Sequence, residues 1–178
     1  FKADSAIQIT KRLRTIAEPD DCFRTHRKKV SVRFAWRIVT QKYFRGISSG
    51  GIEFVDRIPA AFPPVLCDRG QFLEILYQIA LNGVQAALKE RRGENDRPKL
   101  VIRAQEGFFP AEEPCAMIAI ADTGPGIAGE RLPHLFKPFM TTKPEGEGNG
   151  LGLYFIKQLV LRNGGKIGVS SFPGAGTT

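Results

Sequence analysis

The sequence predicts an α+β domain, and three observations support this prediction. Segments with helical periodicity and segments with strand alternation both occur along the chain. Their order is irregular, unlike the steady β-α-β alternation of a doubly wound sheet. Hydrophobic residues make up 42% and charged residues 25% of the 178 residues, which is typical of a globular chain and not of a disordered one.

The first elements are predicted from periodicity alone. Residues 1–17 read as a polar helix, because Ile7, Ile9, Leu13 and Ile16 mark an imperfect apolar stripe. The segment at 28–45 mixes both signals and favours a short strand followed by a helix.

The next elements have clearer boundaries. Residues 51–59 alternate as a strand, and the two prolines within 61–68 predict a loop. Asp68 is a suitable N-cap for an amphipathic helix over residues 69–89.

The second half of the chain is predicted to contain three strands and two helices. The elements are, in order, strands at 99–106 and 115–121, a short helix within 129–139, a glycine-rich loop at 140–150, a helix from Leu151 to Arg162, and a strand at 166–171. The last helix is closed by Asn163-Gly164-Gly165, which is a strong C-cap signal.

Charge and cysteine content limit the classes of function. A net charge of +8 would suit nucleic acid, a membrane surface or a phosphorylated ligand. No zinc finger or RNA-binding aromatic motif accompanies the basic run at 24–29, so we expect no nucleic acid partner. No apolar run approaches the ~20 residues of a membrane span, and no signal peptide opens the sequence, so we expect no membrane contact. Three dispersed cysteines favour a reducing, cytoplasmic location.

The motif GPGIAG at 124–129 matches the dinucleotide fingerprint G-x-G-x-x-G. A dinucleotide fold would require a regular helix directly after it, but Pro133 interrupts early and a glycine-rich loop follows. No Walker P-loop motif is present. The sequence therefore argues against both of these nucleotide folds.

Two polar residues in apolar surroundings are better candidates for a site. Asp122 ends a strand that is predicted to be buried, where its carboxylate can accept a hydrogen bond from an exocyclic amine such as that of adenine. Gly124 and Gly126 would let the backbone approach a flat ligand. Asn82 lies in the most apolar helix, one turn after Gln78, and its amide oxygen is a hard ligand that suits Mg²⁺. An ordinary turn and an exposed polar stripe are the competing interpretations.

Glycines at 146, 148, 150 and 152 stand just before the last predicted helix. Ordering glycine costs conformational entropy, so this spacing needs a reason. A phosphate cradle, a flexible lid and a plain turn are all compatible with the glycine pattern.

Taken together, the motifs resemble a known family. Asn82, DTGPG at 122–126, LFKPF at 135–139, GNGLGL at 148–153 and GAGT at 174–177 occur in the order of the N, G1, F, G2 and G3 boxes. This order resembles the ATP-binding catalytic domain of sensor histidine kinases, in the GHKL superfamily with the Bergerat fold that also includes DNA gyrase and MutL. The sequence PFMTTKPEGEGNGLGL at 138–153 is most similar to the nitrogen-regulator-sensor subgroup of this family. The resemblance covers about residues 26–178 and implies a two-layer α/β sandwich, with a mixed, mainly antiparallel sheet and helices on one face.

The resemblance also implies ATP and Mg²⁺ as cofactors and assigns roles to residues. Asn82 would ligate Mg²⁺, and Asn82 and Lys143 would serve catalysis. Asp122 would hold the adenine amine. Phe136 and Phe139 would anchor an ATP lid that contains Thr141, Thr142 and Lys143. The implied nucleotide-binding set is Asn82, Gln85, Asp122, Gly124, Gly126, Ile127, Phe136, Thr141, Thr142, Lys143, Gly148, Asn149, Gly150, Leu151, Gly152, Leu153 and Thr177.

The chain departs from the common family pattern at several positions. Gln78 stands where the family's asparagine is frequent, Gly83 replaces an alanine, Gln85 and Ala86 replace a lysine and an aromatic residue, and Asn149 replaces a threonine. Hydrolytic relatives have a glutamate one turn before the Mg²⁺ asparagine. An amide such as Gln78 cannot take a proton from water near pH 7, which suits transfer of the phosphoryl group to another acceptor.

The acceptor histidine is expected upstream of residue 1. Neither His26 nor His134 is followed by an acid, so neither fits the phospho-accepting pattern. Residues 1–25 would then be the tail of a dimerisation and phosphoacceptor helix with its linker, and 26–178 the catalytic domain. The expected partners are ATP or ADP, the chain's own dimerisation domain, and a response regulator receiver domain. The full-length protein would be a homodimer and residues 1–178 alone a monomer. The cytoplasmic portion of a membrane-anchored sensor is an alternative to a wholly cytoplasmic protein. A serine-type protein kinase, a hydrolytic clamp and a non-catalytic nucleotide-binding module remain as alternatives.

Overall fold

The computed structural model describes residues 7–12, 26–48, 51–89, 97–109, 113–140 and 150–178. A five-stranded sheet has the strand order β3-β5-β6-β1-β7. Its strands are β1 (Ile7–Arg12), β3 (Glu53–Arg57), β5 (Lys99–Phe109), β6 (Glu113–Asp122) and β7 (Gly165–Ile167). The β3–β5 pair is parallel and the other pairs are antiparallel. The predicted mixed, mainly antiparallel sheet is therefore confirmed.

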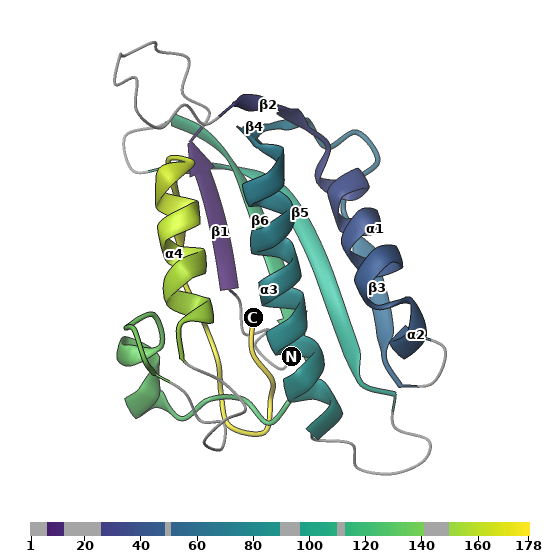
Figure 1. Cartoon of the computed structure of the whole chain (residues 1–178), viewed down its shortest axis with the longest axis vertical. Helices are drawn as coiled ribbons and strands as arrows, with labels where there is room; N and C mark the ends of the chain where they lie inside the picture. The colour runs from purple at the N-terminus through teal and green to yellow at the C-terminus, as the bar shows by residue number, and fades with distance from the viewer. Residues whose placement is uncertain (1–6, 13–25, 49–50, 90–96, 110–112, 141–149) are drawn as a thin grey trace.

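The three long helices cover one face of this sheet (Figure 1). They are α1 (Val32–Tyr43), α3 (Arg69–Lys89) and α4 (Gly152–Arg162), and a short helix, α2 (Arg45–Ser48), follows α1. The central helix α3 contacts α1 on one side, α4 on the other, and β5 and β6 beneath it. The fold is thus the two-layer α/β sandwich that the motifs imply, and α3 lies in its middle.

The helix predicted over residues 1–17 is wrong where the structure describes it. Ile7–Arg12 form β1, which pairs Ile7 with Ile120 of β6 and Ile9 with Ile167 of β7. The alternation Ile7-Gln8-Ile9-Thr10 also fits a strand, and tertiary pairing decides between two weak local patterns. An upstream helix therefore does not include Ile7–Arg12, and the rest of 1–25 lies outside the described residues.

A second, two-stranded sheet pairs β2 (Arg27–Val30) with β4 (Val65–Asp68). The predicted strand-then-helix order at 28–45 is confirmed by β2 and α1. The loop predicted over 61–68 is wrong at its end, because Val65 and Cys67 are buried and β4 pairs with β2. Prolines 63 and 64 lie just before β4, where a missing N–H costs no ladder hydrogen bond.

Helix α3 has the predicted bounds and the predicted cap. The Gln71 backbone N–H donates to Asp68 Oδ1 over 2.9 Å, which satisfies one of the first-turn amides. Residues Phe72, Ile75, Leu76, Ile79, Ala80, Val84 and Ala87 are buried at helical spacing. Among the described residues, no helix is both long and apolar enough to cross a membrane.

Asn163 ties the start of α3 to the end of α4. Its side chain is 3% exposed, accepts from the Asp68 N–H at 3.0 Å, and donates to Gln71 Oε1 at 2.7 Å and to the Leu159 carbonyl at 2.9 Å. Gly164 follows with φ +73°, a conformation that favours glycine, so the predicted C-cap is confirmed. At this end of the molecule the two helices are therefore joined through one buried amide.

The two central strands β5 and β6 are longer than the predicted 99–106 and 115–121, whereas two later elements are shorter than predicted. The helix expected within 129–139 is a 3₁₀ helix over Gly129–His134, and the last strand covers only Gly165–Ile167. Beyond β7, Ser170 and Thr178 exchange two backbone hydrogen bonds of 3.0 Å each, which close a turn over 171–177. This turn lies against the end of β6, where the Asp122 N–H donates to the Thr177 carbonyl at 2.7 Å.

Candidate functional site

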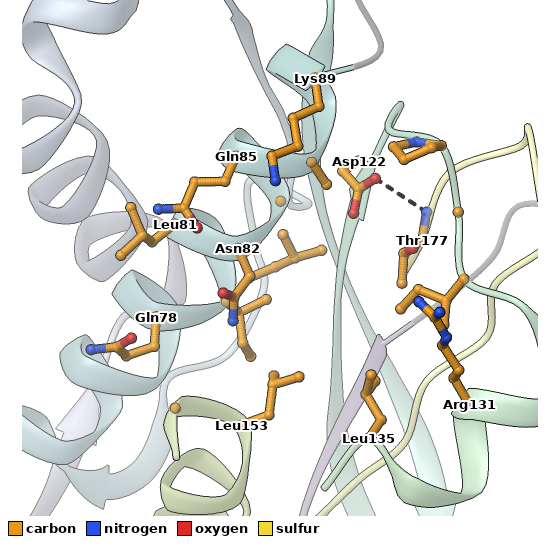
Figure 2. Close-up of a pocket in the computed structure, with 18 of the residues that line it drawn as sticks. Gln78, Leu81, Asn82, Gln85, Lys89, Asp122, Arg131, Leu135, Leu153 and Thr177 are labelled. Carbon is orange, nitrogen blue, oxygen red and sulfur yellow. Dashed lines mark hydrogen bonds between the residues drawn. The ribbon is translucent and has the colours of Figure 1, made fainter. Parts of the chain in front are cut away.

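A cavity of about 670 Å³ opens between α3, the start of α4 and the loop that follows β6. Figure 2 shows the helix α3 forming one wall, with Asp122 and Thr177 on the opposite side. The lining residues include Gln78, Leu81, Asn82, Gln85, Lys89, Asp122, Gly126, Ile127, Arg131, Leu135, Gly150, Gly152, Leu153 and Thr177. The surface of the cavity is mainly apolar, with polar side chains supplied by α3, by the end of β6 and by the loops around it, as in typical small-molecule sites.

The polar stripe of α3 faces this cavity. Gln78, Asn82 and Gln85 are spaced by one turn and all line it. They are held close to the sheet by Gly83, where a Cβ would come within 2.5 Å of Leu100 Cδ1 and 3.4 Å of Asp122 Cβ. The stripe is thus part of a site and not a solvated face, and the glycine that follows Asn82 sets the distance between helix and strand.

Asp122 occupies the end of β6 as predicted. Its Oδ1 accepts from the Gly124 N–H at 2.8 Å and from the Thr177 N–H at 3.2 Å. Its other carboxylate oxygen points into the cavity (Figure 2). Burial raises the pKa of Asp122 to about 6, although the hydrogen bonds from Gly124 and Thr177 act in the opposite direction. The result is an oriented acceptor that can receive a hydrogen bond from an amine.

The loop after Asp122 interlocks with the turn at 171–177. Gly126 has φ +75°, and a Cβ there would lie 2.0 Å from the Phe172 carbonyl oxygen. A Cβ on Gly176 would lie 2.1 Å from the Asp122 carbonyl oxygen. Only glycine therefore fits at these two contacts, and the two segments approach each other backbone to backbone.

Ser171 joins these two segments through hydrogen bonds. It is 5% exposed, and its Oγ accepts from the Ile127 N–H at 2.8 Å. The same Oγ lies 2.9 Å from the Gly176 carbonyl and 2.8 Å from Thr177 Oγ1. Ser171 does not line the cavity, but it fixes both Ile127 and Thr177, which do.

The opposite end of the cavity is the beginning of α4. Gly150 has φ +66°, and a Cβ there would lie 2.5 Å from the Phe139 carbonyl carbon. Gly152 opens the helix, and the first amides of a helix have no partner within it. A helix N-terminus with Asn82 near it is suited to bind a phosphate group.

The structure brings most of the described candidates together. Asn82, Gln85, Asp122, Gly126, Ile127, Gly150, Gly152, Leu153 and Thr177 line the cavity. Gly124, Phe136 and Leu151 are described but do not line it. Gly124 instead packs on α3, because a Cβ there would lie 2.8 Å from Ala86 Cβ. Thr141, Thr142, Lys143, Gly148 and Asn149 lie outside the described residues.

The predicted set omits several residues at or beside the cavity. Lys89 and Arg131 are cations that line it, Gly83 lines it and lets α3 approach Leu100, and Ser171 holds residues that line it. Lys89 lies one turn after Gln85, so helical spacing could have indicated it. Ser171 carries no local signal, because its partners are distant in sequence.

The chemistry of the lining residues fits ATP and Mg²⁺. Within the described ranges, no three His, Cys, Asp or Glu residues form a group that could hold a metal. Mg²⁺ commonly relies on few protein ligands together with waters and the substrate's phosphates. One amide oxygen at Asn82 and a helix N-terminus for the phosphates meet that requirement, while Asp122 offers an acceptor to the base.

Comparisons with known proteins identify the family of this chain. Residues 73–178 match the family described as "Histidine kinase-, DNA gyrase B-, and HSP90-like ATPase". The chain is 36% identical over 123 residues to "Sensor kinase CckA" of Brucella abortus, and 31% identical over 116 residues to "Sensor histidine kinase ZraS" of Escherichia coli K12. These alignments cover 65% of this chain in both cases but only 12% and 22% of the relatives, so the chain spans a small part of their length.

Solved structures share the fold. The nucleotide-free catalytic domain of histidine kinase ThkA has a TM-score of 0.68 at 24% identity, with 85% of this chain and 91% of that chain covered. Full-length ShkA in complex with AMPPNP has a TM-score of 0.67 at 24% identity, with 87% and 30% covered. The chain therefore belongs to the histidine kinase-, DNA gyrase B- and HSP90-like ATPase family. Within that family it is an ATP-binding catalytic domain of the sensor histidine kinase type, as the order of its motifs predicts.

Proposed function

We propose that this domain binds Mg²⁺·ATP in the cavity and transfers the γ-phosphoryl group to a histidine that lies upstream in a longer chain. One observation carries the proposal. Asp122, Asn82 and the N-terminus of α4 line one cavity, in which an acceptor for an amine and a phosphate-binding helix end are both present. Such a cavity can hold a ligand with a base at one end and phosphates at the other.

The proposed roles follow from the chemistry of each group. The cavity-facing oxygen of Asp122 receives the adenine amine, and the Thr177 N–H and Gly124 N–H keep the carboxylate in that orientation. Asn82 supplies an amide oxygen to Mg²⁺, which neutralises the developing phosphate charge when it is bound. Lys143, outside the described residues, is proposed to reach the phosphates from the lid. The protein thus acts mainly by positioning and by charge neutralisation.

The residue before Asn82 on this face favours transfer over hydrolysis. Gln78 lines the cavity one turn before Asn82 and has an amide, which is not a base for water. We therefore expect slow ATP hydrolysis in the absence of an acceptor. The dimerisation domain of the same protein and a response regulator receiver domain are the proposed partners in the relay.

We also propose that the chain is of the nitrogen-regulator-sensor type and acts in the cytoplasm. The sequence around the lid supports the first proposal, and so does 30% identity over 122 residues to "Sensory histidine kinase/phosphatase NtrB" of Rhizobium meliloti. That alignment covers 64% of this chain and 30% of the relative. Measuring phosphotransfer to a panel of receiver domains tests this subgroup assignment. If the assignment is right, the nitrogen-regulator receiver should be phosphorylated fastest.

The experiment combines binding with phosphotransfer. Calorimetry should detect Mg²⁺·ADP binding, and an added dimerisation domain with its histidine should acquire an acid-labile phosphate from ATP. Asn82→Asp should abolish this transfer, whereas Gln41→Glu, the same amide-to-acid change on the exposed face of α1, should not. An acid-stable phosphate on serine, or transfer by Asn82→Asp at the wild-type rate, would contradict the proposal.

A further inference from the structure

Glu74 and Gln78 form a hydrogen-bonded pair on the face of α3 that leads to the cavity. Gln78 Nε2 donates to Glu74 Oε1 over 2.7 Å, one helical turn apart. Both residues are partly buried, and Gln78 lines the cavity together with Asn82 and Gly152. Glu74 itself does not line the cavity, so it acts only through its neighbour.

This pair fixes which end of the Gln78 amide faces the cavity. A carboxylate has only acceptor atoms, so the amide must present its nitrogen to Glu74. Figure 2 shows the Gln78 nitrogen pointing away from the cavity. Its carbonyl oxygen lies 3.8 Å from the position that a Cβ on Gly152 would take, at the start of α4. The terminal torsion of glutamine is broad and nearly two-fold, so without Glu74 either atom could take this place.

We propose that Glu74 is a positioning residue, which holds the Gln78 oxygen toward the metal and phosphate end of the site. This inference rests on the proposed function. Amide oxygens are acceptors that suit hydrated Mg²⁺, whereas an amide NH₂ in the same place would present donors to a cation and its waters. With Gln78 oriented, the site offers a second amide oxygen one turn from that of Asn82.

The effect of this positioning is specific to magnesium. A side-chain pair at this spacing also supports the helix slightly, so stability alone does not distinguish the two roles. Orientation of the Gln78 oxygen should matter only when Mg²⁺ accompanies the nucleotide. The informative quantity is therefore the ratio of the ADP dissociation constants measured without and with Mg²⁺, which we call the magnesium gain.

The test is calorimetry of ADP binding in excess Mg²⁺ and in EDTA. Glu74→Ala should lower the magnesium gain about fivefold, which is the net contribution typical of one hydrogen bond, with little change in EDTA. Glu74→Gln, which keeps an acceptor oxygen, should retain most of the gain. In the Gln78→Ala background, Glu74→Ala should have no further effect. Glu106→Ala, which removes an exposed carboxylate on β5 outside the cavity, is the matched control and should leave the gain unchanged.

The outcomes separate this inference from the proposed function. If wild-type protein binds no ADP under either condition, both are overturned. If wild type binds and Glu74→Ala keeps the wild-type magnesium gain, only the role of Glu74 is overturned. An equal loss of affinity with and without Mg²⁺ also overturns it, because Glu74 would then merely support α3. Alanine is a good helix former, so Glu74→Ala should fold, and its melting temperature checks this.

Discussion

The two ends of the cavity are built by different means. At the end around Asp122, the backbone of β6 and of the loop after it touches the turn at 171–177 directly, so that Gly126 and Gly176 have no room for a side chain. At the end around Asn82, the polar groups are side-chain amides on one helix and the N-terminus of another. The first end is a fixed shape, and the second is a set of groups whose orientation depends on neighbours such as Glu74.

This difference suits the two parts of a nucleotide. A flat base requires one oriented acceptor in a rigid site. The backbone contacts of Gly126 and Gly176 provide such rigidity, because changes of side-chain rotamer do not alter them. Phosphates with their metal change charge and position during transfer, and side chains on helices can adjust to them. We therefore expect substitutions at the first end to affect stability and all nucleotide binding, and those at the second end to affect magnesium and transfer.

The largest expected effect comes from Gly126→Ala. The new Cβ would lie 2.0 Å from the Phe172 carbonyl oxygen at φ +75°, so the loop and the turn must separate. We expect a loss of about 3 kcal/mol or more in the free energy of unfolding, measured by urea denaturation. Gly174→Ala is the matched control, because Gly174 has φ +74° but nothing within 4 Å of its Cβ position. It should cost only about 1–2 kcal/mol, the penalty of the left-handed backbone. Equal losses in Gly126→Ala and Gly174→Ala would show that the contact between the loop and the turn does not contribute to the free energy of unfolding.

The next largest effect concerns Asp122. Asp122→Asn should weaken ADP binding about 100-fold in calorimetry, because it removes the charged acceptor for the amine. Since the pKa of Asp122 is raised to about 6 and the ionised form is the stronger acceptor, wild-type affinity should fall between pH 7 and pH 5, by about tenfold at most. The ADP affinity of Asp122→Asn should lack this pH dependence.

Unfolding does not explain that fall in affinity. The folded-state pKa lies above the ordinary value of 3.8, so ionisation of Asp122 costs stability as the pH rises, and protonation restores it. A melting temperature that decreased in parallel with affinity between pH 7 and pH 5 would contradict this account.

How much of this could be predicted from the sequence differs between the two ends. Local chemistry identified Asp122 at the end of a strand, the Asp68 cap and the polar stripe of α3. Gly83 next to Asn82 was recognised only as a departure from the family, because the Leu100 side chain that requires it comes from another element. The strands β1 and β4 were missed since their partners are distant, and local alternation cannot decide such pairing.

A smaller effect is expected for substitution of Ser171. This substitution tests whether the Asp122 end of the cavity acts independently of the magnesium end. Ser171→Ala removes the acceptor for the Ile127 N–H and a partner of Thr177 Oγ1 in a buried position. We expect a loss of about 1–3 kcal/mol in stability and about fivefold weaker ADP binding, equal with and without Mg²⁺. Ser170→Ala, next in sequence and only partly buried, serves as the control. A magnesium-dependent loss in Ser171→Ala would mean that the two ends are coupled.

The smallest effect is expected at Lys89. This exposed cation lines the cavity and can attract an anionic nucleotide, but solvent screens it. Lys89→Ala should weaken ADP binding about twofold at low salt and not at high salt. Binding measured in a series of salt concentrations tests this, and a salt-independent loss would instead indicate a direct hydrogen bond.

The buried amide of Asn163 has a mechanical consequence. It fastens the start of α3 to the end of α4, which lie side by side in Figure 1. The cavity is lined instead by α3 from Gln78 onward and by the first residues of α4. The two helices also pack against each other and against the sheet, so Asn163 adds a polar tie to the apolar contacts that fix the angle between them. A residue that does not line the cavity therefore helps to set the arrangement of two helices that do.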